Sequence, residues 1–460
     1  MNKTTPMIHF KKYALMLVIL AGAMQMGAQE STNTNFSLQQ ALEYAMKNSP
    51  NQLNAELDLK NAEYRKKEIT GSGLPQITGS IDIKDYINIP TSLLPGQIFG
   101  GAPGTFIPVK FGTKYNSTVG LNASQLLFSS DYIFALKASE EFLNLSRINI
   151  NRSRSEVISQ VSRAYYAVLI ANDRMKLLDA NIVRLKKMLD DTKALNQQGF
   201  VELIDVERIE VTYNNLVSER EKVARLVDLA KSALKFQMGY KISDPIELTD
   251  NLSSITETPE ELSLSKIDIS KRPDFQLLNT QQTMLDLDVK RQKWSYLPTL
   301  AAYFAHQYNA QRQTFNLLQF DDTDPNKQWF KVTLIGATMN LTIFNGFQRS
   351  NRYQQAKVAS AKNLNTLKSL SLGAELEATS AVIMYSNAVT SLAVQKKNME
   401  LAQHVVDVVQ KKFQAGVGSN IEIINAETSL KEAQTNYYNA LYDMIVSKID
   451  YQKATGNLYK

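Results

Sequence analysis

The chain has 460 residues, no cysteine and a formal net charge of +6 at neutral pH. Without cysteine, a disulfide framework, a thiolate metal site and a lipidated N-terminal cysteine are all excluded. Lys3, Lys11 and Lys12 lie in the N-terminal segment, so the remainder is close to neutral and gives no reason to expect nucleic-acid binding.

The N-terminal segment has the pattern of a secretory signal peptide over residues 1–28. An uncharged apolar run from Tyr13 to Ala23 follows Lys11 and Lys12, and small residues precede Gln29. No later stretch is apolar over the roughly 18 or more residues of a transmembrane helix. If the mature chain crosses a membrane, we therefore expect it to do so through the strands of a closed β-barrel.

Two pairs of prolines with the same spacing bracket polar, amphipathic helical stretches. Pro50 and Pro75 lie 25 residues apart, as do Pro273 and Pro298. Because proline ends a helix, each stretch should change to another structure at its second proline.

Period-two alternation follows each second proline and predicts strands with one apolar and one wet face. The first β-hairpin is expected at about 74–129, with a Gly/Pro-rich loop from Pro90 to Gly112. The second is expected at about 298–345, with a polar loop through Asp321 to Asn326. In the first strand the apolar positions are Ile77, Ile81, Ile83, Ile87 and Ile89.

Seven-residue repeats of large and small apolar residues predict two long helical hairpins, at about 131–238 and 348–455. A heptad period held this long predicts a left-handed supercoil. The tips of the hairpins are expected at Gly199 and Gly416, which we interpret as left-handed helix caps rather than phosphate-binding glycines.

The matched order of these features indicates an internal repeat. Gly199 to Gly239 and Gly416 to Gly456 both span 40 residues. We expect a first repeat over 29–240, a polar connector over 241–270 that surrounds the helices as an equatorial collar, and a second repeat over 271–460.

Four strands cannot close a barrel, and an open sheet edge is not viable in hydrocarbon, so several copies must pool their strands. Three copies would supply twelve strands. The expected fold class is mainly α with membrane β. Aromatic residues near the junctions of strands and helices suggest an interfacial girdle, although they could instead simply fill the junctions. They are Phe128, Trp294, Tyr296, Phe344 and Phe347.

The paired proline-to-proline units, two long hairpins and tips of the form Gly-x-x-x-x-x-[Asp/Glu]-[Val/Ile] resemble the TolC-type outer membrane efflux protein family over almost the whole mature chain. The resemblance implies a homotrimer with a twelve-stranded barrel in the outer membrane and a periplasmic α-helical barrel. It also implies a periplasmic adaptor and an inner membrane pump as partners. The expected function is then the passive exit duct of a tripartite efflux or type I secretion system.

The resemblance also implies roles for residues at the tips. By position, Asp205 matches a gate-linking aspartate, Glu422 an entrance-ring acid and Phe413 a tyrosine that takes part in gating. For both acids, stabilisation of a helix N-terminus is the alternative. Gly418 stands where some members have a gate arginine, and Asn425 where some have a second acid, so the links and the ring charge should differ.

Enzyme function is not expected, and no cofactor or metal site is predicted. The histidines, His9, His306 and His404, lack metal-ligand spacing. The segment from Asp322 to Asn326 has alternating oxygen ligands but lacks the glycine and distal glutamate of a calcium loop. A helical scaffold or adaptor without channel activity remains the alternative function.

Overall fold

The computed structural model describes residues 34–252, 268–316, 319, 323–324 and 327–458. The predicted signal peptide and much of the loop through Asp321 to Asn326 lie outside these residues. By their contacts the described residues form two compact units. We call residues 34–48, 161–252 and 398–438 the tip unit, and residues 49–160, 268–397 and 439–458 the sheet unit.

The chain is mainly helical, with one four-stranded sheet. The helices are α2 (Leu38–Asn48), α3 (Pro50–Gly71), α4 (Ser130–Gln197), α5 (Leu203–Met238), α6 (Pro273–Trp294), α7 (Gln348–Gln414) and α8 (Asn420–Ala454). Short 3₁₀ helices occur at η1 (Gly96–Phe99) and η4 (Ile269–Lys271). Within the described ranges, no helix combines the length and apolar character needed to cross a membrane.

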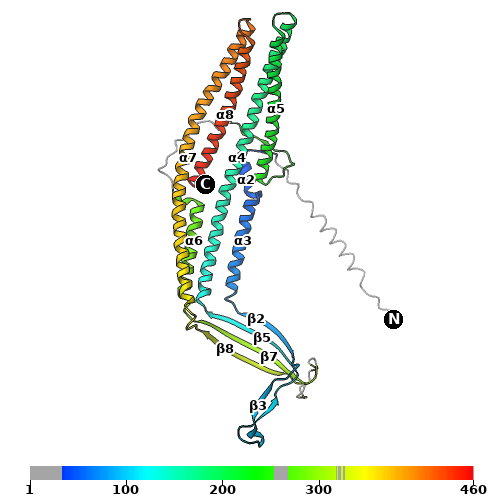
Figure 1. The fold of residues 1–460 in the computed structure, drawn as a ribbon, viewed down its shortest axis with the longest axis vertical. Helices are drawn as coiled ribbons and strands as arrows, with labels where there is room; N and C mark the ends of the chain where they lie inside the picture. Colours follow the sequence, from blue (N-terminus) through cyan, green and yellow to red (C-terminus); the bar gives the residue numbers. More distant parts are fainter. Residues whose placement is uncertain (1–33, 253–267, 317–318, 320–322, 325–326, 459–460) are drawn as a thin grey trace, which may run out of the picture. The chain divides into compact units, whose positions relative to one another are not determined.

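The sheet is antiparallel, with the strand order β2-β5-β7-β8 (Figure 1). Its strands are β2 (Gln76–Asp85), β5 (Tyr115–Phe128), β7 (Thr299–Arg312) and β8 (Phe330–Asn340). The pairing of β5 with β7 joins the N-terminal and C-terminal strand pairs, for example at Val119 and Tyr308. Within the described residues, β2 and β8 have no strand on their outer sides.

The register divides the side chains of the sheet into two faces, because directly paired residues point to the same side. Ile77, Ala123, Phe304 and Ile335 lie in one row, and Ile81 lies in a parallel row on that same apolar face. The opposite, polar face has Thr78, Ser80, Asp82, Asn122, Thr118, Gln307 and Asn309. The alternation after Pro75 and Pro298 thus forms strands with one apolar and one polar face, although β2 ends at Asp85, before the predicted positions Ile87 and Ile89.

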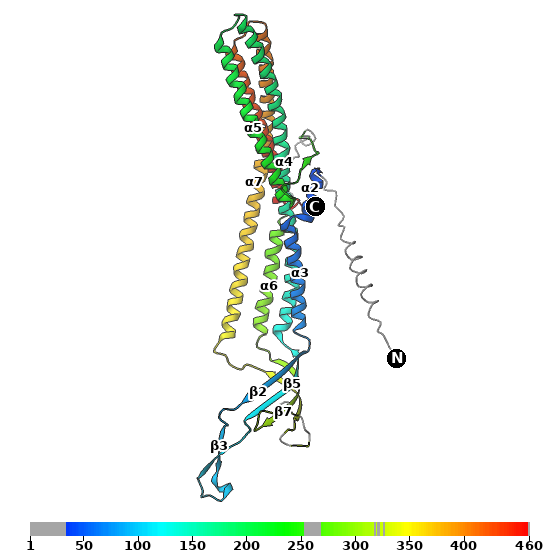
Figure 2. The same cartoon turned by 90° about the vertical axis from the view of Figure 1, so that its right-hand side faces the viewer.

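The predicted Gly/Pro-rich loop contains a second small hairpin. Strands β3 (Thr91–Pro95) and β4 (Phe106–Lys110) pair in antiparallel fashion over five residues each. Figure 2 shows this β3–β4 hairpin beyond the end of β2 and β5. The tip is closed by the Gly96 amide, which donates to the Thr105 carbonyl at 2.7 Å. Glycines and prolines punctuate the segment so closely that its short strands give no clear periodic signal.

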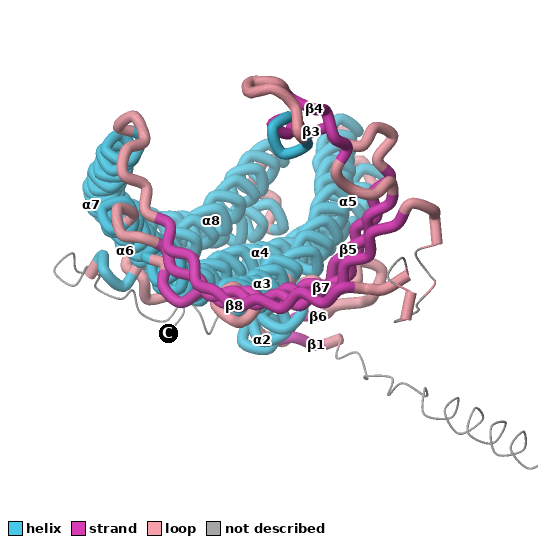
Figure 3. Tube along the Cα trace, turned by 90° about the horizontal axis from the view of Figure 1, so that it is seen from below, coloured by secondary structure: helices cyan, strands magenta, loops and turns pink. Residues whose placement is uncertain are grey.

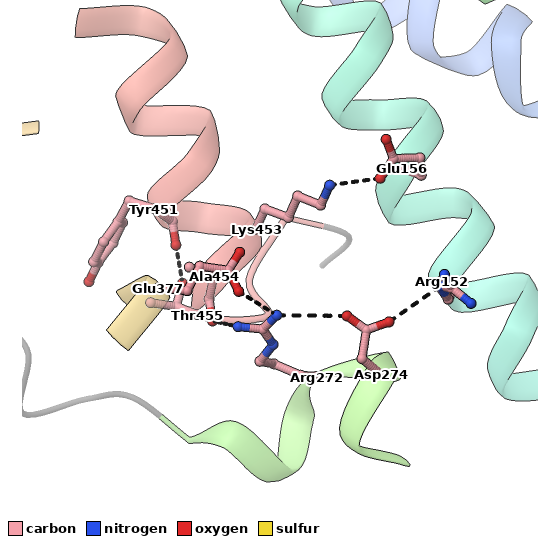
Figure 4. A network of polar contacts seen from close by, with 9 residues as sticks. All are labelled: Arg152, Glu156, Arg272, Asp274, Glu377, Tyr451, Lys453, Ala454 and Thr455. Carbon is pink, nitrogen blue, oxygen red and sulfur yellow. Dashed lines mark hydrogen bonds and ion pairs between the residues drawn. The ribbon is translucent and has the colours of Figure 1, made fainter. Parts of the chain in front are cut away.

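Polar contacts fix the helices of the sheet unit near the end of α8. The Arg272 guanidinium is buried, donates to the Ala454 carbonyl at 3.3 Å, and lies 2.8 Å from a Glu377 carboxylate oxygen (Figure 4). Lys453 contributes a second ion pair, with Glu156 on α4, at 2.7 Å. Arg272 therefore satisfies a terminal carbonyl of α8 and holds the start of α6 beside α7.

In the tip unit, the N-terminal segment pairs with the connector. Strand β1 (Asn35–Phe36) runs parallel to β6 (Glu247–Leu248). The fully buried Tyr165 places its hydroxyl 2.9 Å from an Asp250 carboxylate oxygen and 3.0 Å from the Phe36 carbonyl. Residues 253–267 of the predicted connector lie outside the described residues.

The Tyr165 hydroxyl should make the stability of the tip unit fall at alkaline pH. Burial, and then the hydrogen bond to Asp250, raise the pKa of Tyr165 above its ordinary value. The neutral hydroxyl therefore stabilises the fold fully below the unfolded pKa of about 10, and this stabilisation is lost as the pH rises through the higher folded value. We expect thermal melts between pH 8 and pH 11 to show a smaller alkaline loss for Tyr165→Phe than for wild type. The exposed Tyr64→Phe serves as the control, and an equal loss in all three proteins would contradict the prediction.

Candidate functional site

The two hairpin tips have the same backbone turn. At the first, Gly199 has φ of 80°, and the amide of the next residue, Phe200, donates to the Leu195 carbonyl at 3.0 Å. At the second, Gly416 has φ of 75°, and the Val417 amide donates to the Lys412 carbonyl at 3.0 Å. A glycine in the left-handed region, followed by an amide that donates to the carbonyl five residues earlier, is a common end of a helix. Both glycines thus adopt the conformation expected of left-handed caps.

The position of Gly418 leaves no room for a side chain. A Cβ atom built there would lie 2.9 Å from the Phe413 amide nitrogen and 3.1 Å from the Lys412 carbonyl carbon. These are backbone atoms, so the turn would have to move. An arginine at this position is therefore incompatible with the turn as it stands.

Both predicted acids lie in the first turn of the helix that leaves a tip. Glu422 is exposed, and its amide donates to the Ser419 hydroxyl at 3.4 Å, which makes Ser419 the residue that caps α8. Asp205 lies in the first turn of α5, 3.8 Å from Arg208. A carboxylate at either place favours the helix, whatever else it does.

Asn420 joins the two tips, and sequence reasoning did not select it. Its side chain is buried, and its Nδ2 donates to the Asp205 carbonyl at 2.6 Å and approaches the Asp205 carboxylate at 3.3 Å. Its Oδ1 is buried without a hydrogen-bond partner. The one available signal was an asparagine at the start of a helix, which suggests a local cap and not a contact with a residue 215 positions away.

Phe413 packs into the hydrophobic core of the tip unit. It is partly buried against a cluster from α4, α5 and α8 that includes Val206, Ile209 and Ile423. Its ring has no hydroxyl and so cannot make the hydrogen bond that a tyrosine would make. Its contribution at the tip is therefore apolar packing.

A buried polar network lies farther along the same helices. Arg184 on α4 donates to both carboxylate oxygens of Glu427 on α8, at 2.8 and 2.9 Å. Asn181 accepts from Arg184 at 2.8 Å and donates to Gln434 at 2.8 Å. Glu427 is only 5% exposed, so this two-point ion pair holds α4 and α8 together inside the packed tip unit.

The predicted girdle aromatics are all exposed in the single chain. Phe128 ends β5, Trp294 ends α6, and Tyr296 lies under the Arg349 guanidinium, 5.5 Å from its ring centroid. Phe344 and Phe347 form an edge-to-face pair with ring centroids 5.6 Å apart. Phe347 lies in the β8–α7 turn with φ of 62°, which is rare for a residue other than glycine, and its side chain is exposed.

No group of three or more histidine, aspartate or glutamate side chains suited to a metal ion occurs among the residues that the structure describes. The features gathered at the tips are caps, hydrogen bonds and packed rings. Features of this kind can hold helices together or release them.

Known proteins resemble this chain in sequence. The sequence pattern of the family described as "Outer membrane efflux protein" matches residues 269–457. The outer membrane protein TolC of Salmonella enteritidis is 21% identical over 75% of this chain and 70% of its own length. The alkaline protease secretion protein AprF of Pseudomonas aeruginosa is 21% identical over 73% of this chain and 68% of its own.

Similarity to solved structures concerns the fold. The outer membrane protein VceC of Vibrio cholerae superimposes with a TM-score of 0.69, at 16% identity, over 92% of this chain and 97% of its own. The matching sequence pattern, the TolC and AprF similarities and the shared fold agree with one another. The chain is therefore similar to the TolC-type proteins of the outer membrane efflux protein family, and these similarities support a location in the outer membrane with a periplasmic extension.

Proposed function

We propose that three copies of this chain form a passive exit duct through the outer membrane, for a tripartite efflux or type I secretion system. Their sheets would pool into a twelve-stranded barrel, and their helical hairpins would continue the duct into the periplasm as an α-helical barrel.

The observation that supports this most directly is the sheet with two open edges and two unlike faces. Ile77, Ile81 and Ile335 are largely exposed on one face, whereas the other face is mostly polar. In hydrocarbon, the backbone groups of β2 and β8 need partners, which a neighbouring copy can supply. In such a ring the apolar face would contact lipid and the polar face would line water.

The exposed aromatics fit the periplasmic rim of that barrel. Phe128, Trp294, Tyr296, Phe344 and Phe347 follow or precede strand ends, where interfacial rings stabilise membrane barrels. The two halves of the chain also repeat the order of helix, strand, strand and helical hairpin, and we infer that they are a duplicated unit.

The proposed partners are a periplasmic adaptor protein and an inner membrane pump. A duct needs no chemistry of its own, so we assign no enzymatic role, no cofactor and no resident metal. The cargo would be whatever the pump delivers. A helical scaffold or adaptor that does not conduct is the alternative function.

Gating is proposed at the tips. Gly199 and Gly416 shape the turns, Phe413 anchors α7, and Asp205 links the two hairpins through Asn420. Glu422 is exposed in the first turn of α8, and three copies around an axis would form an acidic ring that attracts cations.

Planar bilayer recordings of the purified protein test this proposal. We expect discrete, cation-selective conductance that divalent or trivalent cations block when they are added on the tip side. Glu422→Ala should weaken that block about tenfold, because the blocking ion loses carboxylates that act together at short range. Glu432→Ala removes an exposed acid of the same helix ten residues farther on and should leave the block unchanged.

Two outcomes would count against the duct. Correctly inserted trimers that never conduct, even when the tips are loosened by substitution, would favour the scaffold. Conductance with a cation block that is equal in wild type and Glu422→Ala would keep the channel but remove Glu422 from its entrance.

A further inference from the structure

The β3–β4 hairpin is an exposed and almost uncharged surface. Between residues 87 and 113 the single charged side chain is Lys110. Large apolar residues are nevertheless open to solvent over both strands and the tip. They are Leu93, Ile98, Phe99, Phe106, Ile107 and Phe111. Several exposed large apolar residues on one short hairpin are typical of an interaction site.

The β3–β4 hairpin has regular strand pairing, so its exposed apolar residues lie on ordered strands and a closed turn. Its strands pair from Thr91 with Lys110 to Pro95 with Phe106. At the tip, the Gly101 amide donates to the Gly96 carbonyl at 2.8 Å, and a Cβ on Gly96 would lie 2.3 Å from the Thr105 hydroxyl oxygen. The tip is thus closed by hydrogen bonds of its own backbone.

A second unpartnered apolar surface lies at the other edge of the same sheet. Phe330, Val332 and Leu334 at the start of β8 are exposed. The register puts all three on the face that is otherwise polar, in rows with Asn309, Gln307 and Ala305. We call these three residues the β8 patch. An apolar patch on a water-facing surface indicates that another protein surface packs against it.

The two surfaces lie at opposite edges of the sheet but at the same end. The hairpin is inserted between β2 and β5, a few residues beyond the Asp85 and Tyr115 pair, and β2 is one edge strand. The β8 patch begins the other edge strand, and both lie at the strand ends away from the helices. Figure 3 shows β8, β7 and β5 following a curve, with the β3–β4 hairpin beyond its β5 side.

We propose that the β3–β4 hairpin of one copy packs on the β8 patch of the neighbouring copy. This rests on the proposed ring of copies, which brings the β2 edge of one chain beside the β8 edge of the next. A five-residue strand spans about 17 Å, and adjacent strands lie about 4.8 Å apart, so the hairpin can reach across the neighbour's edge. The contact is head to tail, and it repeats around a closed ring.

Cysteine cross-linking tests the contact cleanly, because the chain has no cysteine of its own. In the full-length protein in outer membranes, Ile98→Cys with Leu334→Cys should form disulfide-linked dimers and trimers under mild oxidation. The matched control is Ile98→Cys with Ile335→Cys, because Ile335 is the next residue but lies on the opposite, apolar face. We expect at least tenfold less cross-linked product from the control pair. A second pair, Leu93→Cys with Val332→Cys, tests the same contact in case the first two cysteines are poorly oriented for a disulfide.

The outcomes separate this inference from the proposed function. Equal or absent cross-linking in both pairs, from a protein that is trimeric by native mass and conducts, would overturn the hairpin contact and leave the duct standing. Strong cross-linking of Ile98→Cys alone would also overturn it, since the hairpins would then meet one another. A protein that is not trimeric at all would remove the proposed duct itself.

Discussion

Replacing Asn420 with aspartate should uncouple the two hairpin tips and raise the open probability of the proposed duct at least tenfold. The change keeps the shape of the side chain but replaces the donor that lies 2.6 Å from the Asp205 carbonyl with a second negative charge. Lost hydrogen bonds of this kind cost about 1–3 kcal/mol, and about 1.4 kcal/mol already changes an equilibrium tenfold. The carboxylate gains only about 0.3–1 kcal/mol from its place at the start of α8. Repulsion from Asp205 adds to the loss.

Single-channel recordings measure the open probability, and Asn436→Asp is the matched control. Asn436 lies sixteen residues farther along α8 and is exposed, so the substitution adds the same charge away from the link and from the entrance. Amide hydrogen exchange in the first turn of α8 provides a readout that does not depend on conduction, and it should accelerate only in Asn420→Asp. Unchanged exchange and unchanged open probability would show that this link does not hold the tips.

Removing Glu427 should destabilise the tip unit more than any surface change. Glu427→Ala leaves the Arg184 guanidinium without the two carboxylate oxygens at 2.8 and 2.9 Å, in a place where the glutamate is almost fully buried. Breaking a buried pair by removing one partner typically costs about 3–5 kcal/mol. We expect a loss of this size in the free energy of unfolding of the detergent-solubilised protein, measured by urea denaturation.

The exposed pair between Arg220 and Asp179, at 2.9 Å, provides the comparison. Both side chains remain at least 40% exposed, so Asp179→Ala should cost less than about 1 kcal/mol. Adding Arg184→Met to Glu427→Ala should restore part of the lost stability, because the orphaned charge is removed as well. Similar losses for Glu427→Ala and Asp179→Ala, or no recovery in the double variant, would mean that the buried network does not stabilise the tip unit.

Much of the local structure could be predicted because its causes lie within short stretches of chain. Alternation of isoleucine with polar residues predicts β2, since a strand with two unlike environments needs that period. The glycines at 199 and 416 mark turns, because only glycine enters the left-handed region without strain. Seven-residue repeats of apolar residues predict α4, α5, α7 and α8, because that period places the apolar residues on one face of a helix, where they can pack.

One missed feature is local, and the others depend on residues that are distant in sequence. The β3–β4 hairpin was expected only as a loop, because glycine and proline interrupt its strands every few residues. Asn420 and Asp205 lie 215 positions apart, and Arg184 and Glu427 lie 243 apart. No local pattern distinguishes Asn420 from Asn425, or Glu427 from Glu432, until the fold brings a partner to one of each pair.

By itself, the sequence determined the type and extent of the helices, the two faces of the strands and the glycine turns, because each follows from local sterics or from the period of apolar residues. The family resemblance came from the order of the repeated motifs. Only the tertiary structure decided that β5 pairs with β7, that Asn420 ties the tips together, that Glu427 is buried against Arg184, and that apolar surfaces remain open at both edges of the sheet. These depend on which long-range contacts the packed chain forms, and a one-dimensional period does not contain that information.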